Sequence, residues 1–329
     1  MVDRGSPASG QAGILTLLAN RPTIELLRAL EGDVSTRPDL EQRLRSMSRS
    51  RLTSRLAQLL GRQLIICQHI PARRARVGYV LTPAGRGLLE IAEALSVALP
   101  GATSSPDMPL AALIASRGHR AIIRALAYRP LTGAELELCL PSIPHATLLR
   151  SLNRLRDAQL LVARRGNGRR HVRYELTTEA RRLGRTAVLV ARWRWRWTPE
   201  HVPAGTTDLA SVVHLVAPLA SVPRISRGVC MLHAQPPPGA NGLPDVYLSV
   251  ANGRVTPLAV GSPRDPDCRM RAAPASWCEA LMSGDSASIC MQGDRRLGEV
   301  VITALAGAVR PEPRGGRRAF EGRPRLRQG

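Results

Sequence analysis

An internal repeat constrains the fold of this chain more than any other feature of its sequence. When the sequence is shifted by 96 positions, residues 17–64 fall on similar residues in 113–160. Beyond that segment the shift becomes 95, and residues 79–82 fall on 174–177. A register kept over about seventy residues is hard to attribute to composition. The sequence therefore predicts two tandem units of the same fold, which differ by one residue in a loop.

The second copy indicates what each unit contains. Leu148, Leu152 and Leu155 recur at helical spacing after Pro144, which is tolerated at a first helical position, so we expect an amphipathic helix with one buried face. Its opposite face is polar and consists of Thr147, Arg150, Asn153 and Arg154, together with Ala146. Residues that favour strands then flank the glycines of segment 166–168, which predicts a hairpin. The arginines around this hairpin are Arg164, Arg165, Arg169, Arg170 and Arg173.

The first copy has the same layout with fewer arginines. Ser48 is a good N-cap for a helix that directs Leu52, Leu56 and Leu59 inward. The exposed face of this helix is expected to consist of Ser50, Arg51, Ser54 and Gln58. The hairpin predicted over residues 64–81 carries Arg73, Arg74 and Arg76 at its tip.

A helix with one buried face, followed at once by an arginine-rich hairpin, is the layout of a winged helix-turn-helix. In that fold the third helix, here called the recognition helix, enters the major groove of DNA, and the hairpin, or wing, lies along the phosphates. A guanidinium on the recognition helix can bond guanine bidentately. The alternative for these helix arginines is an ordinary solvated surface.

The net charge of +22 is unevenly distributed, and all 47 basic residues are arginine. Arginines outnumber carboxylates by fourteen to eight in residues 1–100, by eighteen to seven in 101–200 and by seven to two in 310–329. Residues 201–309 hold eight of each. The absence of lysine is typical of a GC-rich genome, and we expect a bacterial source. The distribution predicts that the first two hundred residues and the tail meet a polyanion, whereas residues 201–309 have another role.

Other classes of function find little support in the sequence. The six cysteines form no C-x-x-C pair, which indicates reduced, cytoplasmic thiols rather than disulfides or a zinc site. No Ser-His-acid set and no paired carboxylates occur in a recognisable arrangement. We therefore predict no enzyme, no catalytic residue, no cofactor and no metal. The longest apolar run, near 209–220, is interrupted by His214 and Pro218, so no membrane insertion is expected.

The predicted fold class is mainly α with α+β. The expected order is a disordered N-terminus over 1–12, winged-helix domains over 13–101 and 109–198, an α+β domain over 207–309 and a basic, disordered tail over 310–329. The run Arg-Trp-Arg-Trp-Arg-Trp at 192–197 is suited to stacking on nucleic acid or to binding an anionic membrane surface. The favoured interpretation is that it ends a long helix and packs its tryptophans into a domain junction.

Both copies resemble the HxlR-type branch of winged-helix transcription regulators. The resemblance rests on Leu-Leu-Arg-Ala-Leu at 26–30 and Ile-Ile-Arg-Ala-Leu at 122–126, on the leucine spacing of the third helices, and on the closing segments 79–86 and 174–181. It implies that the third helix and wing contact DNA and that flanking helices dimerise, although the usual chain holds one unit. The family's Gly-Gly-Lys-Trp motif is missing, with Ala-Asn-Arg-Pro at 19–22, and so is the N-terminal cysteine that some members use as a sensor. Redox sensing is therefore not implied.

The last predicted domain resembles the sterol carrier protein type-2-like domain that is sometimes attached to such regulators. The resemblance rests on segments 246–250, 253–255 and 265–272, on Trp277, and on the Gly-Asp turn at 293–294. It implies at most an apolar cavity for a small ligand.

Together these observations predict a DNA-binding transcription regulator, cytoplasmic and nucleoid-associated, that binds double-stranded DNA through two winged-helix units. A small apolar ligand in the C-terminal domain would modulate it. We expect the leucine-rich and valine-rich flanking helices to pair the units as a pseudo-dimer within one chain, or to form a homodimer. The alternative is a sequence-neutral nucleic-acid-binding or nucleoid-associated protein, which the charge alone would support.

Overall fold

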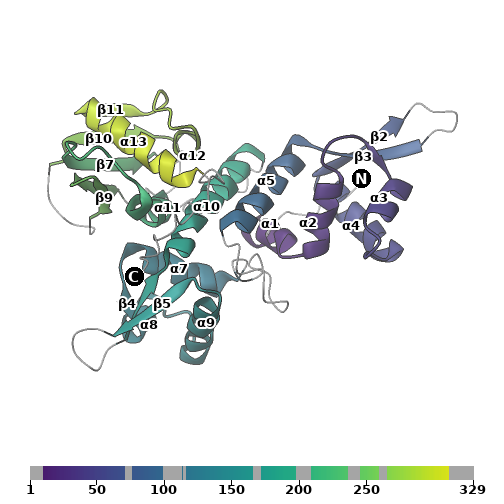
Figure 1. The fold of residues 1–329 in the computed structure, drawn as a ribbon, viewed down its shortest axis with the longest axis horizontal. Coiled ribbons are helices and arrows are strands. Elements are labelled where there is room, and N and C mark those ends of the chain that lie inside the picture. Colours follow the sequence, from purple (N-terminus) through teal and green to yellow (C-terminus); the bar gives the residue numbers. More distant parts are fainter. Residues whose placement is uncertain are drawn as a thin grey trace, which may run out of the picture.

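The computed structural model describes residues 10–70, 76–98, 113, 116–165, 172–197, 209–235, 245–258 and 265–310. Helices and strands gather in three parts, which lie at the right, at the bottom and at the upper left of Figure 1. We call them the N-terminal unit (10–98), the middle unit (116–197) and the C-terminal unit (209–310). The arginine tips at Arg73, Arg74, Arg169 and Arg170, residues 1–9 of the expected disordered N-terminus and the tail from residue 311 lie outside the described residues.

The N-terminal unit packs helices against a small sheet of order β1-β3-β2. Two helices form over residues 10–29, because Pro22 lacks the N–H that a continuous helix needs and stands near the start of the second one. Helix α1 begins at Gly10, earlier than the irregular stretch 1–12 would allow. The elements are α1 (Gly10–Leu18), α2 (Arg21–Ala29), β1 (Ser35–Thr36), α3 (Arg37–Arg43), α4 (Arg49–Gly61), β2 (Ile65–Ile70), β3 (Arg76–Leu81) and α5 (Pro83–Ala98).

The middle unit has the same order of elements from α2 onward, and its sheet has the corresponding order β4-β6-β5. In both sheets a long antiparallel hairpin pairs with a two-residue strand that precedes a short helix. The elements are α7 (Arg117–Tyr128), β4 (Leu131–Thr132), α8 (Gly133–Cys139), α9 (His145–Asp157), β5 (Leu161–Arg165), β6 (Val172–Leu176) and α10 (Thr178–Trp197).

The two units also share a local contact that attaches the closing helix, α5 or α10, to the residues that follow α4 or α9. The Thr82 hydroxyl donates to the carbonyl oxygens of Gln63 and Leu64, at 2.9 and 3.0 Å, and accepts from the first turn of α5. The Thr177 hydroxyl does the same with Gln159 and Leu160, at 2.9 and 3.3 Å. Gln63 and Gln159 both adopt left-handed φ values, of 55° and 57°, which non-glycine residues seldom do. This shared strain shows that the repeat extends to backbone geometry.

A capping box begins α3 in the N-terminal unit and α8 in the middle unit. In the N-terminal unit the Thr36 amide donates to Asp39, and in the middle unit the Thr132 amide donates to Glu135 at 2.7 Å. These bonds satisfy amides that the first helical turn leaves without partners. The hydrogen bond from the Thr132 amide, with those from Arg129 and the Thr132 hydroxyl, lowers the pKa of Glu135 to about 2, so this carboxylate stays charged near neutrality.

The C-terminal unit is a five-stranded sheet of order β11-β10-β7-β8-β9, in which only β7 and β10 run parallel. Burial alternates along β8 and β10, and α13 packs on the buried face against β7 and β10. Gly293 ends the edge strand with a φ of 88°, and a side chain there would meet the Asp267 backbone oxygen at 2.2 Å. The elements are α11 (Leu209–Val216), the 3-10 turn η3 (Ala217–Leu219), β7 (Gly228–Ala234), β8 (Val246–Ala251), β9 (Arg254–Pro257), β10 (Cys268–Ala272), α12 (Pro274–Ser283), β11 (Cys290–Gly293) and α13 (Arg295–Val309).

Helix α10 joins all three units, and Figure 1 shows it at the centre of the molecule. It packs against α5 of the N-terminal unit and against α11, α12 and α13 of the C-terminal unit. The buried Trp193 indole donates to the Ala84 carbonyl oxygen at 2.7 Å, and Arg192 pairs with Glu279 of α12 at 2.8 Å. Trp193 therefore lies in a junction, the role favoured for the Arg-Trp run. Trp197 is 37% exposed and has the Arg196 guanidinium over its ring.

Gly184 allows α10 and α11 to approach closely. A Cβ at this position would lie 2.2 Å from the Val216 side chain. We expect Gly184→Ala to lower the free energy of unfolding by about 1 to 3 kcal/mol, because overpacking forces the two helices apart. Gly307→Ala on α13 is the matched control, since no atom lies within 4 Å of its added methyl and alanine favours a helix. Denaturant unfolding that shows Gly184→Ala as stable as the control variant would contradict this packing.

Candidate nucleic-acid interface

Helix α4 of the N-terminal unit divides into a buried face and an exposed face. Leu52, Leu56 and Leu59 are buried, and Ser48 caps the helix by accepting from the Arg51 amide at 3.4 Å. Of the four residues expected on the outer face, Ser50, Arg51 and Ser54 are exposed, whereas Gln58 is half-buried. The Gln58 side chain accepts from Arg55 at 2.6 Å. The structure thus leaves Ser50, Arg51 and Ser54 facing solvent and ties Gln58 into a contact within the helix.

Helix α9 of the middle unit has the same division with a more basic outer face. Leu148, Leu152 and Leu155 are buried. The four residues predicted for the outer face are all exposed: Thr147, Arg150, Asn153 and Arg154. Asn153 also accepts from Arg156 at 3.5 Å. Pro144 precedes the helix in the cap position, with His145 as the first helical residue, so the expectation that proline occupies the first helical position was wrong by one residue.

The hairpins carry further arginines beside these helices. Arg164 and Arg165 end β5, and Arg173 lies directly opposite Arg164 on β6; all three are exposed. Glu175 pairs with Arg164 at 3.0 Å and offsets part of the repulsion between the facing arginines. Arg76 is the first residue of β3, and its side chain is outside the described part of the chain. Exposed arginines therefore occur both on α9 and at the base of the hairpin that follows it.

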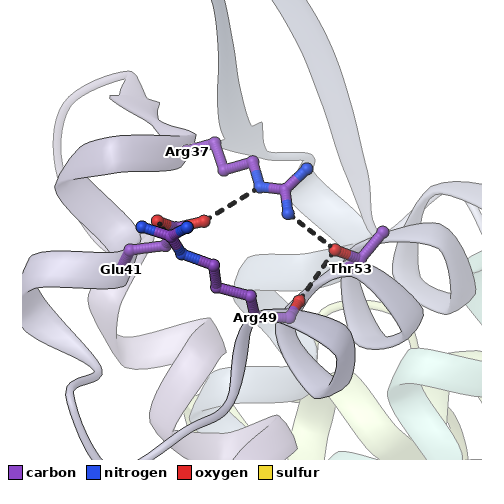
Figure 2. A network of polar contacts seen from close by, with 4 residues as sticks. All are labelled: Arg37, Glu41, Arg49 and Thr53. Carbon is purple, nitrogen blue, oxygen red and sulfur yellow. Dashed lines mark hydrogen bonds and ion pairs between the residues drawn. The ribbon is translucent and has the colours of Figure 1, made fainter.

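A network that the sequence interpretation missed lies where α3 meets α4 (Figure 2). Glu41 of α3 pairs with Arg37 at 3.1 Å and with Arg49, the first residue of α4, at 3.2 Å. Arg37 also donates to the Thr53 hydroxyl at 3.0 Å, and Thr53 donates to the Arg49 carbonyl oxygen. The Arg49 side chain is 83% exposed. One carboxylate thus contacts two basic side chains, Arg37 at the start of α3 and Arg49 at the start of α4.

The spacing of Arg37 and Glu41, four residues apart, is a sequence signal for an ion pair on one helix. The pairing of Glu41 with Arg49 crosses from one helix to the next, so it depends on the angle between them. No periodicity in the sequence indicates that angle. Arg37 and Arg49 are therefore added to the candidate interface from the structure alone.

His119 supports the middle unit from inside. It is 3% exposed, and its Nδ1 lies 2.8 Å from the Leu113 carbonyl oxygen. Burial lowers its pKa, although the Leu113 hydrogen bond acts in the opposite direction. Because the unfolded chain then binds the proton more readily than the folded one, His119 makes the unfolding free energy fall as the pH drops below about 6.5.

His119→Asn should therefore reduce the loss of stability between about pH 7 and about pH 5, since asparagine can keep a hydrogen bond to Leu113 without titrating. Denaturant midpoints measured across this range test the expectation. His69→Asn, at an exposed strand position, is the control. An acid sensitivity that is the same in wild type and His119→Asn would show that His119 titrates normally.

The described residues also show the state of the cysteines, the grouping of possible metal ligands and the character of the helices. All six cysteines are free thiols, and Cys230, Cys268 and Cys278 are buried. Among the described residues, no three His, Cys, Asp or Glu side chains are grouped as ligands for a metal ion. No helix in the described ranges combines the length and apolar character that a membrane crossing requires.

Comparison with known proteins identifies the N-terminal unit. The family model of the HxlR-like helix-turn-helix matches residues 17–98, which run from α1 to the end of α5. Searches of curated proteins and of solved structures found no match to the chain. The N-terminal unit therefore contains a helix-turn-helix domain that is similar to those of the HxlR-like family of DNA-binding transcription regulators.

Proposed function

We propose that the chain is a transcription regulator that binds double-stranded DNA with two winged-helix units, the N-terminal unit and the middle unit. The observation that carries this proposal is the matched order of elements in the two units, each with an exposed polar face on its recognition helix. The shared Thr82 and Thr177 contacts extend the match to individual hydrogen bonds. The family model matches the N-terminal unit, and this match supports DNA binding by the middle unit as well, because the two units repeat the same order of elements.

The units act together as a pseudo-dimer within one chain. Their closing helices, α5 and α10, pack against each other, and Trp193 near the end of α10 lies against Ala84 and Gly87 near the start of α5. The β2–β3 and β5–β6 hairpins extend toward opposite ends of the molecule in Figure 1. Dimeric helix-turn-helix proteins place two recognition helices about 34 Å apart, one turn of DNA, and one chain would here reproduce that arrangement.

Within this proposal the recognition helices read base edges, and the hairpin arginines contact phosphates. The predicted contacts of the first unit are Ser50, Arg51, Ser54, Gln58, Arg73, Arg74 and Arg76. Those of the middle unit are Thr147, Arg150, Asn153, Arg154, Arg164, Arg165, Arg169, Arg170 and Arg173. The cytoplasm, at the nucleoid, is the expected location.

The C-terminal unit is proposed to adjust the spacing of the two DNA-binding units, in response to a small apolar ligand if the sterol-carrier resemblance holds. Its contacts with α10 support this role. Arg181 of α10 donates to the His214 carbonyl oxygen at 3.2 Å, and the Tyr128 ring of α7 lies 4.1 Å from the His214 ring. A movement of α11 would therefore displace both α7 and α10, the first and the last helix of the middle unit.

A salt titration tests the DNA-binding role. Binding of the full chain to a duplex selected from random sequences should be at least about 1,000-fold tighter than binding to a scrambled duplex of the same length and composition. Both affinities should fall steeply with salt, because arginine contacts release counterions. Equal affinity for the two duplexes would favour the sequence-neutral alternative. Failure to bind either duplex would overturn the proposal.

A further inference from the structure

The two units repeat an ion pair, between α3 and α4 in the N-terminal unit and between α8 and α9 in the middle unit, with one difference. Glu41 and Glu137 occupy the same position in the repeat, and so do Arg49 and His145, the first residues of α4 and α9. Glu41 pairs with Arg49 at 3.2 Å, and the Glu137 carboxylate lies 2.5 Å from Nδ1 of His145. An arginine in one unit is therefore replaced by a histidine in the other, against the same carboxylate.

Both basic side chains remain open to a further contact. Their exposed fractions are 83% for Arg49 and 65% for His145. The contact with Glu41 uses the Nε atom of Arg49, and the contact with Glu137 uses the Nδ1 atom of His145. The terminal guanidinium nitrogens and the opposite ring nitrogen, Nε2, are not used by these pairs. Each helix thus begins with a donor that its glutamate holds in one orientation.

We propose that Arg49 and His145 are equivalent DNA contacts, oriented by Glu41 and Glu137, and that the histidine makes DNA binding by the middle unit depend on pH near neutrality. The inference rests on the proposed DNA-binding function, because recognition helices contact DNA through their N-terminal residues. It adds contacts that neither the sequence interpretation nor the family match includes. Arg49 keeps its charge at all physiological pH values, whereas histidine gains or loses its charge between about pH 5 and about pH 8.

The direction of the pH effect follows from the charges around His145. Glu137 faces the ring from α8, and Glu135, the other carboxylate of α8, is bonded to Thr132 and Arg129. Ala146 to Leu149, which follow His145 on α9, carry no charge, and the arginines of that helix begin at Arg150. Protonation changes the net charge of the His145–Glu137 pair from negative to neutral. A polyanion therefore binds more tightly at low pH, and the Arg49–Glu41 pair contributes no such change.

The experiment measures the affinity of the full chain for a selected duplex at about pH 6 and about pH 8, at constant ionic strength. Wild type should bind about 3- to 10-fold more tightly at the lower pH, within the limit for one linked proton. His145→Arg, which recreates the pair of the N-terminal unit, should bind tightly at both pH values, so the ratio of its affinity at the lower pH to that at the higher pH should be near one. His145→Gln should bind weakly at both pH values. The slope of its log affinity against log salt concentration should be smaller in magnitude than that of wild type by about 0.9, but only at the lower pH.

Two further variants separate a DNA contact from a structural link between the helices. His233→Gln removes a histidine that pairs with Asp245 in the C-terminal unit, away from the proposed DNA contacts, and should keep the wild-type ratio. Arg49→His should raise the ratio above that of wild type, since both units would then titrate. Thermal unfolding without DNA should be similar for His145→Arg and wild type, because arginine can keep the contact with Glu137.

A ratio that stays at its wild-type value in both His145→Arg and His145→Gln would overturn this inference while DNA binding itself stands. The same holds if the salt slope of His145→Gln equals that of wild type at the lower pH. Absence of binding by wild type at both pH values would overturn the proposed function, and this inference with it. The two failures are therefore distinguishable.

Discussion

Arg150→Ala combined with Arg154→Ala should remove most of the specific DNA affinity. Each arginine that contacts a base edge is worth about 1 to 3 kcal/mol of discrimination, and both are exposed on α9. The middle unit should dominate affinity, because α9 and the base of its hairpin carry more exposed arginines than α4, whose exposed arginines are Arg49 and Arg51. Arg51→Ala should accordingly cost less than the double variant. Equilibrium binding to a selected duplex and to its scrambled form provides the comparison.

The matched control removes the same charge elsewhere. Arg224→Ala with Arg227→Ala takes two exposed arginines from the C-terminal unit and should leave specific affinity nearly unchanged. If the α9 double variant weakens selected and scrambled duplexes equally, Arg150 and Arg154 contact phosphates. Sequence reading by this helix would then depend on Thr147 and Asn153.

Trp193→Ala should produce the largest loss of stability among single substitutions at the junction. The indole is 9% exposed, and truncating a buried tryptophan costs about 3 to 5 kcal/mol, which includes the cavity left behind. The hydrogen bond to the Ala84 carbonyl oxygen is lost as well. Because Trp193 lies between α10 and α5, we expect denaturant unfolding to separate into two transitions as the N-terminal unit uncouples from the rest.

Trp197→Ala is the control for this effect, since the residue stands one turn later on α10 and is 37% exposed. Its cost should stay within about 0.5 kcal/mol, as is usual for surface substitutions. A single transition at the wild-type midpoint in Trp193→Ala would show that the α5–α10 contact does not couple the units.

Much of the fold was accessible from the sequence because local signals coincide with the elements. The repeat of leucines located α4 and α9, and Ser48 indicated where α4 begins. Such signals depend on residues close together in the chain, where side-chain spacing and backbone chemistry decide the outcome.

Contacts between elements were less accessible. The Arg-Trp run predicted a junction, but nothing in its spacing indicates that Arg192 pairs with Glu279 or that Gly184 lies against Val216. Arg49 was missed for the same reason, because its partner Glu41 belongs to another helix. Pro144 was placed one residue too far into its helix, since proline suits both the cap and the first position of a helix. Tertiary packing decides each of these cases.

The central claim is that two units of one chain bind DNA together, and selection from a pool of random duplexes tests it most directly. The account predicts that full-length protein enriches sequences with two half-sites whose centres lie about 10 base pairs, or one helical turn, apart. Changing the spacing by about five base pairs should then abolish most of the affinity gained from the second half-site, because that half-site turns to the opposite face of the duplex. Enrichment of a single half-site, unaffected by the variants on α9, would contradict a second DNA-binding unit, and a pool without any enriched sequence would contradict sequence-specific binding altogether.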